Sequence, residues 1–233
     1  MQIISIQTKP FLPPQNSILE DLLSLELQDK DILCITSKIL AIHQGRSVKI
    51  GEIDKKKLVE QEADQILGNV VFNNSNFYLT IKNNIIIASS GIDESNGDGY
   101  YILWPEKVDD LLKTFHKILC EKNKIKNLGL IATDSATYPL RRGVRGIAMG
   151  SYGFNPIKSY IGEKDIFERE IKVSVVNVPD SLASSAVFVM GEGKECTPIA
   201  IIREVKDIEF GDFDSTTATI SRKDDIFGEV FKI

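Results

Sequence analysis

Two short acidic segments contain the residues best suited to carry out chemistry. Asp93 lies in a Gly-Ile-Asp-Glu-Ser-Asn segment and Asp134 lies in a Thr-Asp-Ser segment, and each follows an apolar run, 85–88 and 128–131, that predicts a buried strand. Because neighbouring strand ends meet at one edge of a sheet, we expect the two carboxylates to lie close together. Carboxylate and hydroxyl oxygens are the hard ligands that Mg²⁺ or Mn²⁺ prefers, normally beside substrate phosphates. The pattern therefore predicts metal-assisted phosphoryl transfer.

A group of arginines after the second acidic segment fits the same chemistry. Arg141, Arg142 and Arg145 provide fixed positive charge of the kind that nucleotide phosphates or a carboxylate require. A simpler interpretation is that two Asx turns cap the strands and that the basic loop is only solvated. Spacing alone leaves both interpretations open.

Composition limits the class of protein. The chain has 233 residues, 42% of them hydrophobic, and a formal net charge of -5, which argues against general affinity for nucleic acid. Cys34, Cys120 and Cys196 are too widely spaced for a disulfide framework or a zinc pair, so we expect a reducing, cytoplasmic setting. The sequence contains no run of eighteen apolar residues, and we expect no membrane partner.

Several familiar site motifs are absent from the sequence. It has no GxxxxGK[ST] phosphate loop, no GxGxxG after the first strand, no GxSxG elbow and no HExxH. We expect His116 to be structural within a helix, whereas a substrate contact by His43 stays open. Cys34 lies in an apolar strand and Cys196 has no identifiable base, so we predict no thiol chemistry.

Apolar periodicity predicts alternating strands and helices. We expect a strand over 31–36, a hairpin around 82–84, and helices over 54–67, 106–120 and 182–190. The glycine-rich stretch 143–153 is expected to be flexible backbone lining the site, and an alternating strand is expected over 171–175.

This alternation indicates an α/β or α+β protein without a clear linker. Residues 1–233 are therefore expected to form a single catalytic unit. Possible lobes are 1–90 with 175–233, and 91–174.

Four ordered motifs give the chain a resemblance to a known family. They are Ile35-Thr36-Ser37-Lys38, the segment 91–96, Thr133-Asp134-Ser135 with Pro139 and Arg141, and Leu182-Ala183 through Met190-Gly191-Glu192. In this order they resemble the gamma-glutamyl ligases that act on the deazaflavin coenzyme factor 420. The resemblance implies a two-lobed gamma-glutamyl ligase fold, which is neither ATP-grasp nor P-loop. It also implies a GTP- or ATP-dependent enzyme with divalent metal ions and an intertwined homodimer.

The same resemblance implies roles for particular residues. It places Asp93, Asp134 and Arg141 among the catalytic groups. The implied metal ligands are Asp93, Asp134, Ser135 and Glu192. The implied nucleotide-binding residues are Leu12, Pro13, Ser37, Lys38, Asn96, Met190, Gly191 and Gly193.

Some positions depart from the deazaflavin pattern. Glu192 stands where those enzymes typically have Gln, while Ile42, Tyr138 and Leu140 replace a usual Lys, Arg and Trp. The runs 139–144 and 190–198 look more like a bacterial branch assigned to folate metabolism. We therefore expect a folate or dihydropteroate acceptor, with the deazaflavin coenzyme as the alternative.

The implied reaction joins L-glutamate to the carboxylate of this acceptor through an acyl phosphate. Metals held by the two aspartates would neutralise charge on the phosphoryl oxygens, while Lys38 and the arginines orient phosphates or carboxylates. An alternative of another class is a noncatalytic nucleotide- or cofactor-binding protein, which Ile42 and Tyr138 favour. A plain structural α/β protein would make the ordered motifs a coincidence.

Overall fold

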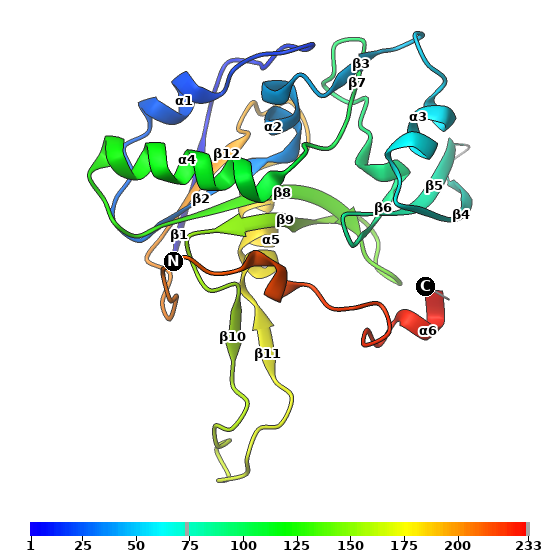
Figure 1. The fold of residues 1–233 in the computed structure, drawn as a ribbon. Coiled ribbons are helices and arrows are strands. Elements are labelled where there is room, and N and C mark those ends of the chain that lie inside the picture. The colour runs from blue at the N-terminus through cyan, green and yellow to red at the C-terminus, as the bar shows by residue number, and fades with distance from the viewer. Residues whose placement is uncertain (73–74, 232–233) are drawn as a thin grey trace.

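The fold is centred on a mixed β-sheet. The computed structural model describes residues 1–72 and 75–231. Across the sheet, the strands lie in the order β1 (Gln2–Ile6), β12 (Ile199–Arg203), β2 (Asp31–Thr36), β8 (Leu128–Thr137) and β9 (Val144–Tyr152) (Figure 1). The pairing of β2 with β8 is parallel, and the other pairings are antiparallel. The α/β class predicted from the sequence is confirmed.

Three helices cover one face of this sheet (Figure 1). They are α1 (Leu19–Ser24), α2 (Ser37–Gln44) and α4 (Val108–Asn123). In α4 the side chains of Leu112, Phe115 and Leu119 are buried against the sheet, as the predicted apolar stripe requires. Burial of this stripe is what holds the helix on the sheet, at roughly 1.5–3 kcal/mol per large apolar side chain.

Helix α5 (Val178–Met190) covers the opposite face and packs most closely on β9. The side chain of Asn177 caps it by accepting a hydrogen bond of 3.0 Å from the backbone of Asp180. A side chain at Gly146 of β9 would meet the carbonyl oxygen of Ala183, 2.4 Å from the position of its Cβ. The expectation of flexible backbone over 143–153 is therefore wrong: glycine lets a regular strand approach the helix.

A smaller antiparallel sheet stands beside the central one (Figure 1). Its strands are β4 (Gln65–Phe72), β5 (Ser75–Lys82) and β6 (Ile85–Ala88), and next to it lie β3 (Ser47–Lys49), β7 (Tyr100–Ile102), α3 (Lys55–Glu62) and the short 3₁₀ helix η1 (Ser89–Gly91). The predicted hairpin between β5 and β6 is confirmed. The predicted helix over 54–67 ends early, because Gln65 and Ile66 pair with β5 instead.

A buried acid joins this smaller sheet to the main body. Glu62 at the end of α3 lies 2.6 Å from Arg46 and 2.6 Å from Lys82 of β5. Burial by itself would raise the pKa of Glu62, but the bonds and charges of these two cations lower it. A charged Glu62 therefore links α3, β5 and the chain that follows α2.

Two further segments extend from the body. Strands β10 (Ile157–Ser159) and β11 (Val175–Asn177) pair to form the base of an arm, which comprises residues 157–177 and projects away from the sheet (Figure 1). The strand expected over 171–175 is wrong, since β11 begins only at Val175.

The C-terminal segment, residues 204–231, carries the 3₁₀ helix η2 (Ser215–Ala218) and α6 (Gly228–Phe231) back past β9. Among residues 1–72 and 75–231, no helix is both long and apolar enough to cross a membrane.

The strands of the central sheet come from all three residue ranges of the suggested lobes. β2 comes from 1–90, β8 and β9 from 91–174, and β12 from 175–233. The strand pairings therefore give no support to that lobe division.

Replacing Gly146 by Ala should destabilise the fold by about 1–3 kcal/mol, because the new methyl group would push β9 away from α5. Thermal and denaturant unfolding of the two proteins measure the change. Gly68→Ala is the matched control, since an added Cβ there meets nothing within 4 Å. Equal stability of the Gly146 variant and wild type would contradict the packing argument.

Candidate active site

Asp93 reaches the site from the smaller sheet and not from the end of a central strand. After β6 the chain turns through Ser89, Ser90 and Gly91, which all have positive φ. Asp93 then forms backbone hydrogen bonds of 3.0 and 2.8 Å with Ile102 of β7. The expectation that both acids terminate neighbouring strands of one sheet is therefore wrong for Asp93.

The carboxylate of Asp93 is held by a lysine and a serine. Lys38 Nζ lies 2.7 Å from Asp93 Oδ2 and also donates to the carbonyl oxygen of Ser95 at 2.6 Å. The backbone N–H of Ser95 donates to Asp93 Oδ1 at 2.8 Å, which is the Asx turn of the simpler interpretation. Burial works to raise the pKa of Asp93, but Lys38 and Ser95 outweigh it and lower the pKa.

Asp134 lies within β8, because this strand continues to Thr137 and past the predicted end. The indole Nε1–H of Trp104 donates to its Oδ2, and the backbone N–H of Ser135 donates to its Oδ1 at 2.7 Å. Burial raises the pKa of Asp134 to about 6, and the negative charge of Asp93 adds to this effect. The two predicted acids are thus close enough to repel one another.

A loop after α5 closes the other side of the site. Ser135 Oγ donates to Glu192 Oε1 at 2.5 Å, and Asn96 Nδ2 donates to the carbonyl oxygen of Gly193 at 3.0 Å. These bonds connect β8, the segment after Asp93 and the loop after Met190. Together with the pairing of Lys38 and Asp93, they gather all four sequence motifs around one point.

These residues surround a cavity of about 560 Å³. Of the predicted residues, those lining it are Leu12, Lys38, Asn96, Asp134, Ser135, Met190, Gly191, Glu192 and Gly193. Asp93, Pro13 and Ser37 lie outside the lining. Asp93 pairs with Lys38 of the lining, and Ser37 forms a side-chain hydrogen bond with Asp134. The volume falls within the range that binds a nucleotide-sized molecule.

The chemistry of these groups suits a hard divalent cation. The carboxylates of Asp93, Asp134 and Glu192 and the hydroxyl of Ser135 are oxygen donors of the kind that Mg²⁺ or Mn²⁺ takes. A cation beside Asp134 would relieve the burial and repulsion that raise its pKa. In the described ranges, however, no three His, Cys, Asp or Glu side chains are close enough to form a metal centre as they stand. The carboxylate of Asp93 is engaged by Lys38 in its place.

The basic loop lies away from this cavity. Arg141 and Arg142 are exposed, and the side chain of Arg141 donates a 3.5 Å hydrogen bond to the neighbouring carbonyl oxygen of Leu140. Arg145 stacks on Tyr138, with its guanidinium carbon 4.7 Å from the ring centre. Arg141 therefore lies in the solvated loop that the simpler interpretation expected.

The remaining candidate residues are structural. His116 lies in α4, with its ring 5.0 Å from that of Tyr152. The ring of His43 lies 5.6 Å from that of Phe115, and burial lowers its pKa. Burial raises the pKa of Cys34 to about 12, which makes its thiol unreactive, whereas Cys196 is exposed beside the cavity.

Trp104 is the site residue that the sequence pattern did not indicate. Its side chain is almost fully buried, and an added Cβ on Gly91 would fall 2.0 Å from the indole nitrogen. A glycine just before Asp93 is thus needed so that the indole can reach Asp134. The available signal was composition: Trp104 is the single tryptophan of the chain.

Comparison with known proteins shows the family. A family model described as F420-0:Gamma-glutamyl ligase matches residues 15–204. The chain belongs to this family of ligases. The relative from Methanocaldococcus jannaschii, named Coenzyme F420:L-glutamate ligase, is 29% identical over 247 aligned positions that cover 97% of this chain and 96% of the relative.

Two relatives of the same name come from Methanosarcina. The one from Methanosarcina barkeri is 31% identical over 193 residues, covering 77% of this chain and 76% of its own length. The one from Methanosarcina mazei is 32% identical over 197 residues, covering 76% and 75%. The names of these relatives agree with the deazaflavin alternative and give the folate interpretation no support.

The raised pKa of Asp134 predicts how stability depends on pH. Between the ordinary value of 3.8 and about 6 the folded protein binds more protons than the unfolded chain, so stability falls as pH rises through this range. Relative to Asp134→Asn, the free energy of unfolding of the wild type should fall by about 2 kcal/mol between about pH 4.5 and about pH 7.5. Denaturant unfolding without added metal or nucleotide measures this difference.

The control for this experiment is Glu94→Gln. Glu94 is exposed and pairs with Lys55, outside the buried site. Asp134→Asn also removes one hydrogen-bond acceptor oxygen. This loss changes the free energy of unfolding equally at both pH values, so it does not affect the comparison. A difference between wild type and Asp134→Asn that does not change with pH would contradict the assigned burial of charge.

Proposed function

We propose that this protein is a nucleotide-dependent ligase that forms an amide between L-glutamate and the carboxylate of a deazaflavin coenzyme of the factor 420 type. The observation that carries the proposal is the meeting of Lys38, Asp93, Asp134 and Glu192 beside one cavity, in a chain of the F420-0:gamma-glutamyl ligase family. The names of the relatives favour this acceptor over folate or dihydropteroate. GTP or ATP is the proposed cosubstrate and Mg²⁺ or Mn²⁺ the proposed metal.

In the proposed reaction, the acceptor carboxylate attacks the terminal phosphate of the nucleotide, the bond to the β-phosphate oxygen breaks, and an acyl phosphate and the nucleoside diphosphate form. The amine of glutamate then displaces phosphate and forms the amide. Bound at Asp93, Asp134, Ser135 and Glu192, a divalent metal would supply charge neutralisation at the phosphoryl oxygens.

The residues of the chain have separate tasks in this scheme. Lys38 offers its ammonium group to phosphate oxygens at the N-terminal end of α2, where Thr36, Lys38 and Ile39 line the cavity. Asn96 and the loop 191–193 border the nucleotide. Trp104 and the backbone of Ser135 fix the direction of the Asp134 carboxylate. Arg141 would have to approach from its loop to orient a substrate carboxylate.

The direct test supplies L-glutamate, Mn²⁺ and either GTP or ATP together with a deazaflavin acceptor or with dihydropteroate. Mass spectrometry should detect an added glutamyl unit on the deazaflavin. Addition to dihydropteroate alone would overturn the choice of acceptor. Nucleotide binding without turnover on any acceptor would instead favour the noncatalytic alternative.

Asp93→Asn and Asp134→Asn should each lower the rate of glutamyl transfer at least about 100-fold, because each removes a negative charge needed beside the phosphoryl group. Turnover at saturating nucleotide and metal measures the effect, and circular dichroism checks the fold. Glu94→Gln is the matched control, as Glu94 is the exposed acid next to Asp93 and should be dispensable. A near-normal rate in either aspartate variant would refute its assigned role.

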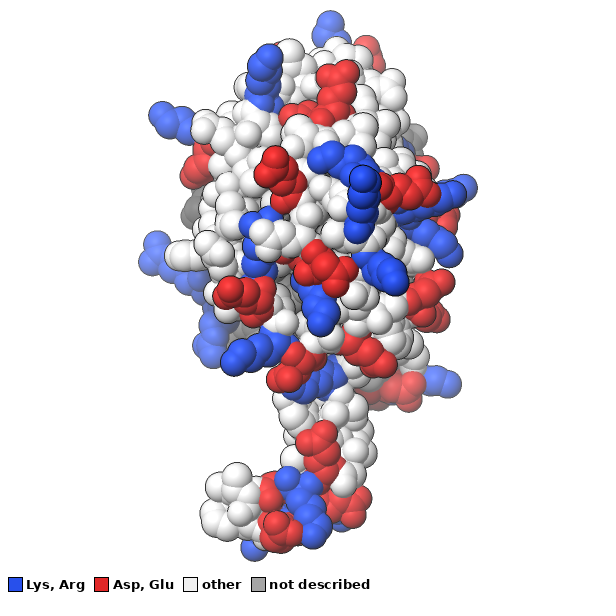
Figure 2. Space-filling view, turned by 90° about the vertical axis from the view of Figure 1, so that its left-hand side faces the viewer, with Lys and Arg blue, Asp and Glu red and all other residues white. Residues whose placement is uncertain are grey.

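We also propose that the working form is a homodimer. The arm exposes large apolar side chains, with Ile166 at 90% and Phe167 at 75% exposure, and Phe188 on the outer face of α5 is 88% exposed. Figure 2 shows the arm standing clear of a body on which basic and acidic side chains are interspersed. Such apolar groups on a projecting hairpin are typical of a surface that packs against another subunit.

Phe167→Asp and Phe188→Asp should shift the protein towards monomer, because each places a charge in the proposed apolar contact. Light scattering coupled to size exclusion measures the mass. Val70→Asp, at an exposed apolar position of β4, is the control and should leave the mass unchanged. A wild-type protein that is monomeric at micromolar concentration would disprove the dimer.

A further inference from the structure

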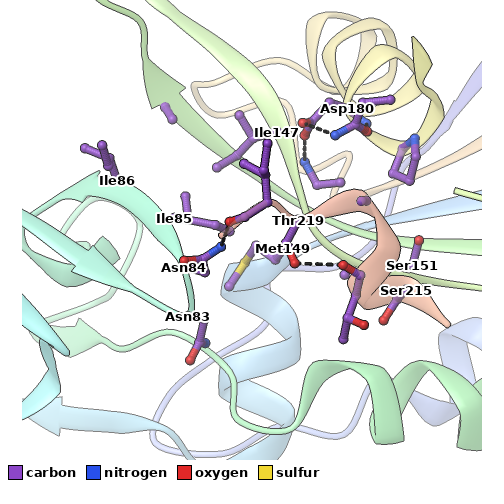
Figure 3. A pocket seen from close by; sticks show the side chains of 18 of the residues that line it. Asn83, Asn84, Ile85, Ile86, Ile147, Met149, Ser151, Asp180, Ser215 and Thr219 are labelled. Atoms are coloured by element: carbon purple, nitrogen blue, oxygen red, sulfur yellow. Dashed lines mark hydrogen bonds between the residues drawn. The ribbon is translucent and has the colours of Figure 1, made fainter. Parts of the chain in front are cut away.

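A second and larger cavity lies along β9, the edge strand of the central sheet. It has a volume of about 730 Å³ and lies between β9, the turn joining β5 to β6, and the C-terminal segment (Figure 3). We name it the β9 cavity, and its lining includes Asn83, Ile86, Ile147, Met149 and Thr219. This volume suits a molecule of many ring atoms and greatly exceeds that of glutamate.

The β9 cavity adjoins the reacting groups. Ile147, which lines it, is paired directly across from Asp134 in the β8–β9 ladder, while Asp134 lines the other cavity. Trp104 connects residues of the two linings: its N–H binds Asp134, and its ring packs in one apolar cluster with Ala136 and Ile147. A molecule in the β9 cavity would therefore be one strand pair away from the Asp134 carboxylate.

The interior is suited to an apolar ring with polar edges. Ile85, Ile147 and Met149 come together in the middle of the cavity, with Asn83 and Asn84 beside them (Figure 3). Branched aliphatic and thioether groups pack well on aromatic rings. Among the described residues, the side-chain amide of Asn83 has no hydrogen-bond partner within the protein. It is therefore available for the hydrogen-bonding edge of a heterocycle.

Two of the charged groups that line the cavity are engaged within the protein. Asp180 accepts hydrogen bonds from Ala148 N at 2.8 Å and Asn177 Nδ2 at 2.9 Å (Figure 3), and Arg222 donates to Gln65 at 2.5 Å. Because these two charges are satisfied within the protein, the space beside them favours an uncharged ring. At the edge, Arg145 stacks on Tyr138 and forms no ion pair with the acids of the described ranges. An anionic chain attached to the ring can therefore run past Arg145.

One wall of the β9 cavity is formed by residues that lie outside the range matched by the family model. The match ends at residue 204, whereas Thr219 and Ile220 belong to the C-terminal segment. Asn84 Nδ2 donates to the carbonyl oxygen of Ile220 at 3.1 Å and ties this segment to the β5–β6 turn. The shape of the cavity thus depends on a part of this chain that the family match does not include.

We propose that the β9 cavity binds the ring end of the acceptor, a planar, largely apolar heteroaromatic system whose anionic chain leads past Arg145 towards Asp134. This inference rests on the proposed function and adds the place and the recognition chemistry of the acceptor. The nucleotide, in this arrangement, occupies the cavity beside Lys38 and Asn96.

The test fills the β9 cavity from an exposed position. Thr219 and Thr217 are exposed threonines of the same segment, each with a side-chain hydrogen bond to a nearby carbonyl, of 2.7 and 2.8 Å. Thr219 lines the cavity and Thr217 does not. Thr219→Trp should raise the Kd for 8-hydroxy-5-deazariboflavin about tenfold or more, and Thr217→Trp should leave it unchanged. Equilibrium dialysis with absorbance detection measures Kd, and nucleotide Kd should be the same in all three proteins.

The outcomes separate this inference from the proposed function. If wild type glutamylates a deazaflavin acceptor and Thr219→Trp binds and uses it equally well, the cavity assignment is overturned and the function stands. If Thr217→Trp weakens binding as much as Thr219→Trp, the assignment is also overturned. If wild type neither binds nor glutamylates a deazaflavin, both fail. Selective loss in Thr219→Trp, as a higher KM for the acceptor at unchanged nucleotide KM, supports the assignment.

Discussion

The parallel pairing of β2 with β8 is the constraint on which the site depends. Its register sets Thr36 beside Thr133, so Lys38, in the first turn of α2 after β2, and Asp134, the next residue of β8, lie at the same edge of the sheet. The pair is buried on both faces, and a slip of one residue would exchange the side chains packed on the α4 face with those packed on the α5 face. The smaller sheet then needs only to present Asp93 to an edge that already exists.

The arrangement of charges at this edge of the sheet lowers the stability of the folded protein. Asp134 is taken out of water and lies near another carboxylate, and its hydrogen bonds with Trp104, Ser135 and Ser37 do not restore its ordinary pKa. Asp93 is in the opposite condition, since Lys38 stabilises its charge. Two aspartates from similar sequence contexts thus have different properties, and the difference arises from neighbours that are distant in sequence: Trp104 for one and Lys38 for the other.

The sequence allowed the acids, the lysine and the loop after Met190 to be predicted because each lies in a short motif with its own chemistry. It also predicted β2 within residues 31–36, where an unbroken apolar run suits a strand buried on both faces. The sequence prediction failed for β9. Its glycines were interpreted as flexible backbone, whereas Gly146 allows α5 to pack closely, and that contact depends on tertiary packing. The β9 cavity was beyond reach for the same reason: its walls come from β5–β6, β9 and the C-terminal segment, which no local pattern relates.

Lys38 has one further consequence. Its ammonium group has three donors, and it contacts Asp93 Oδ2, the carbonyl oxygen of Ser95 and Ser95 Oγ. An incoming phosphate that draws this ammonium away leaves Asp93 with an unbalanced negative charge, which is the condition under which it would hold a cation most tightly. Under the proposed function, anion and cation binding at this edge would therefore be thermodynamically linked, and each would raise the affinity for the other by the same factor. One lysine would thus make the protein favour the metal–nucleotide pair over either ion alone.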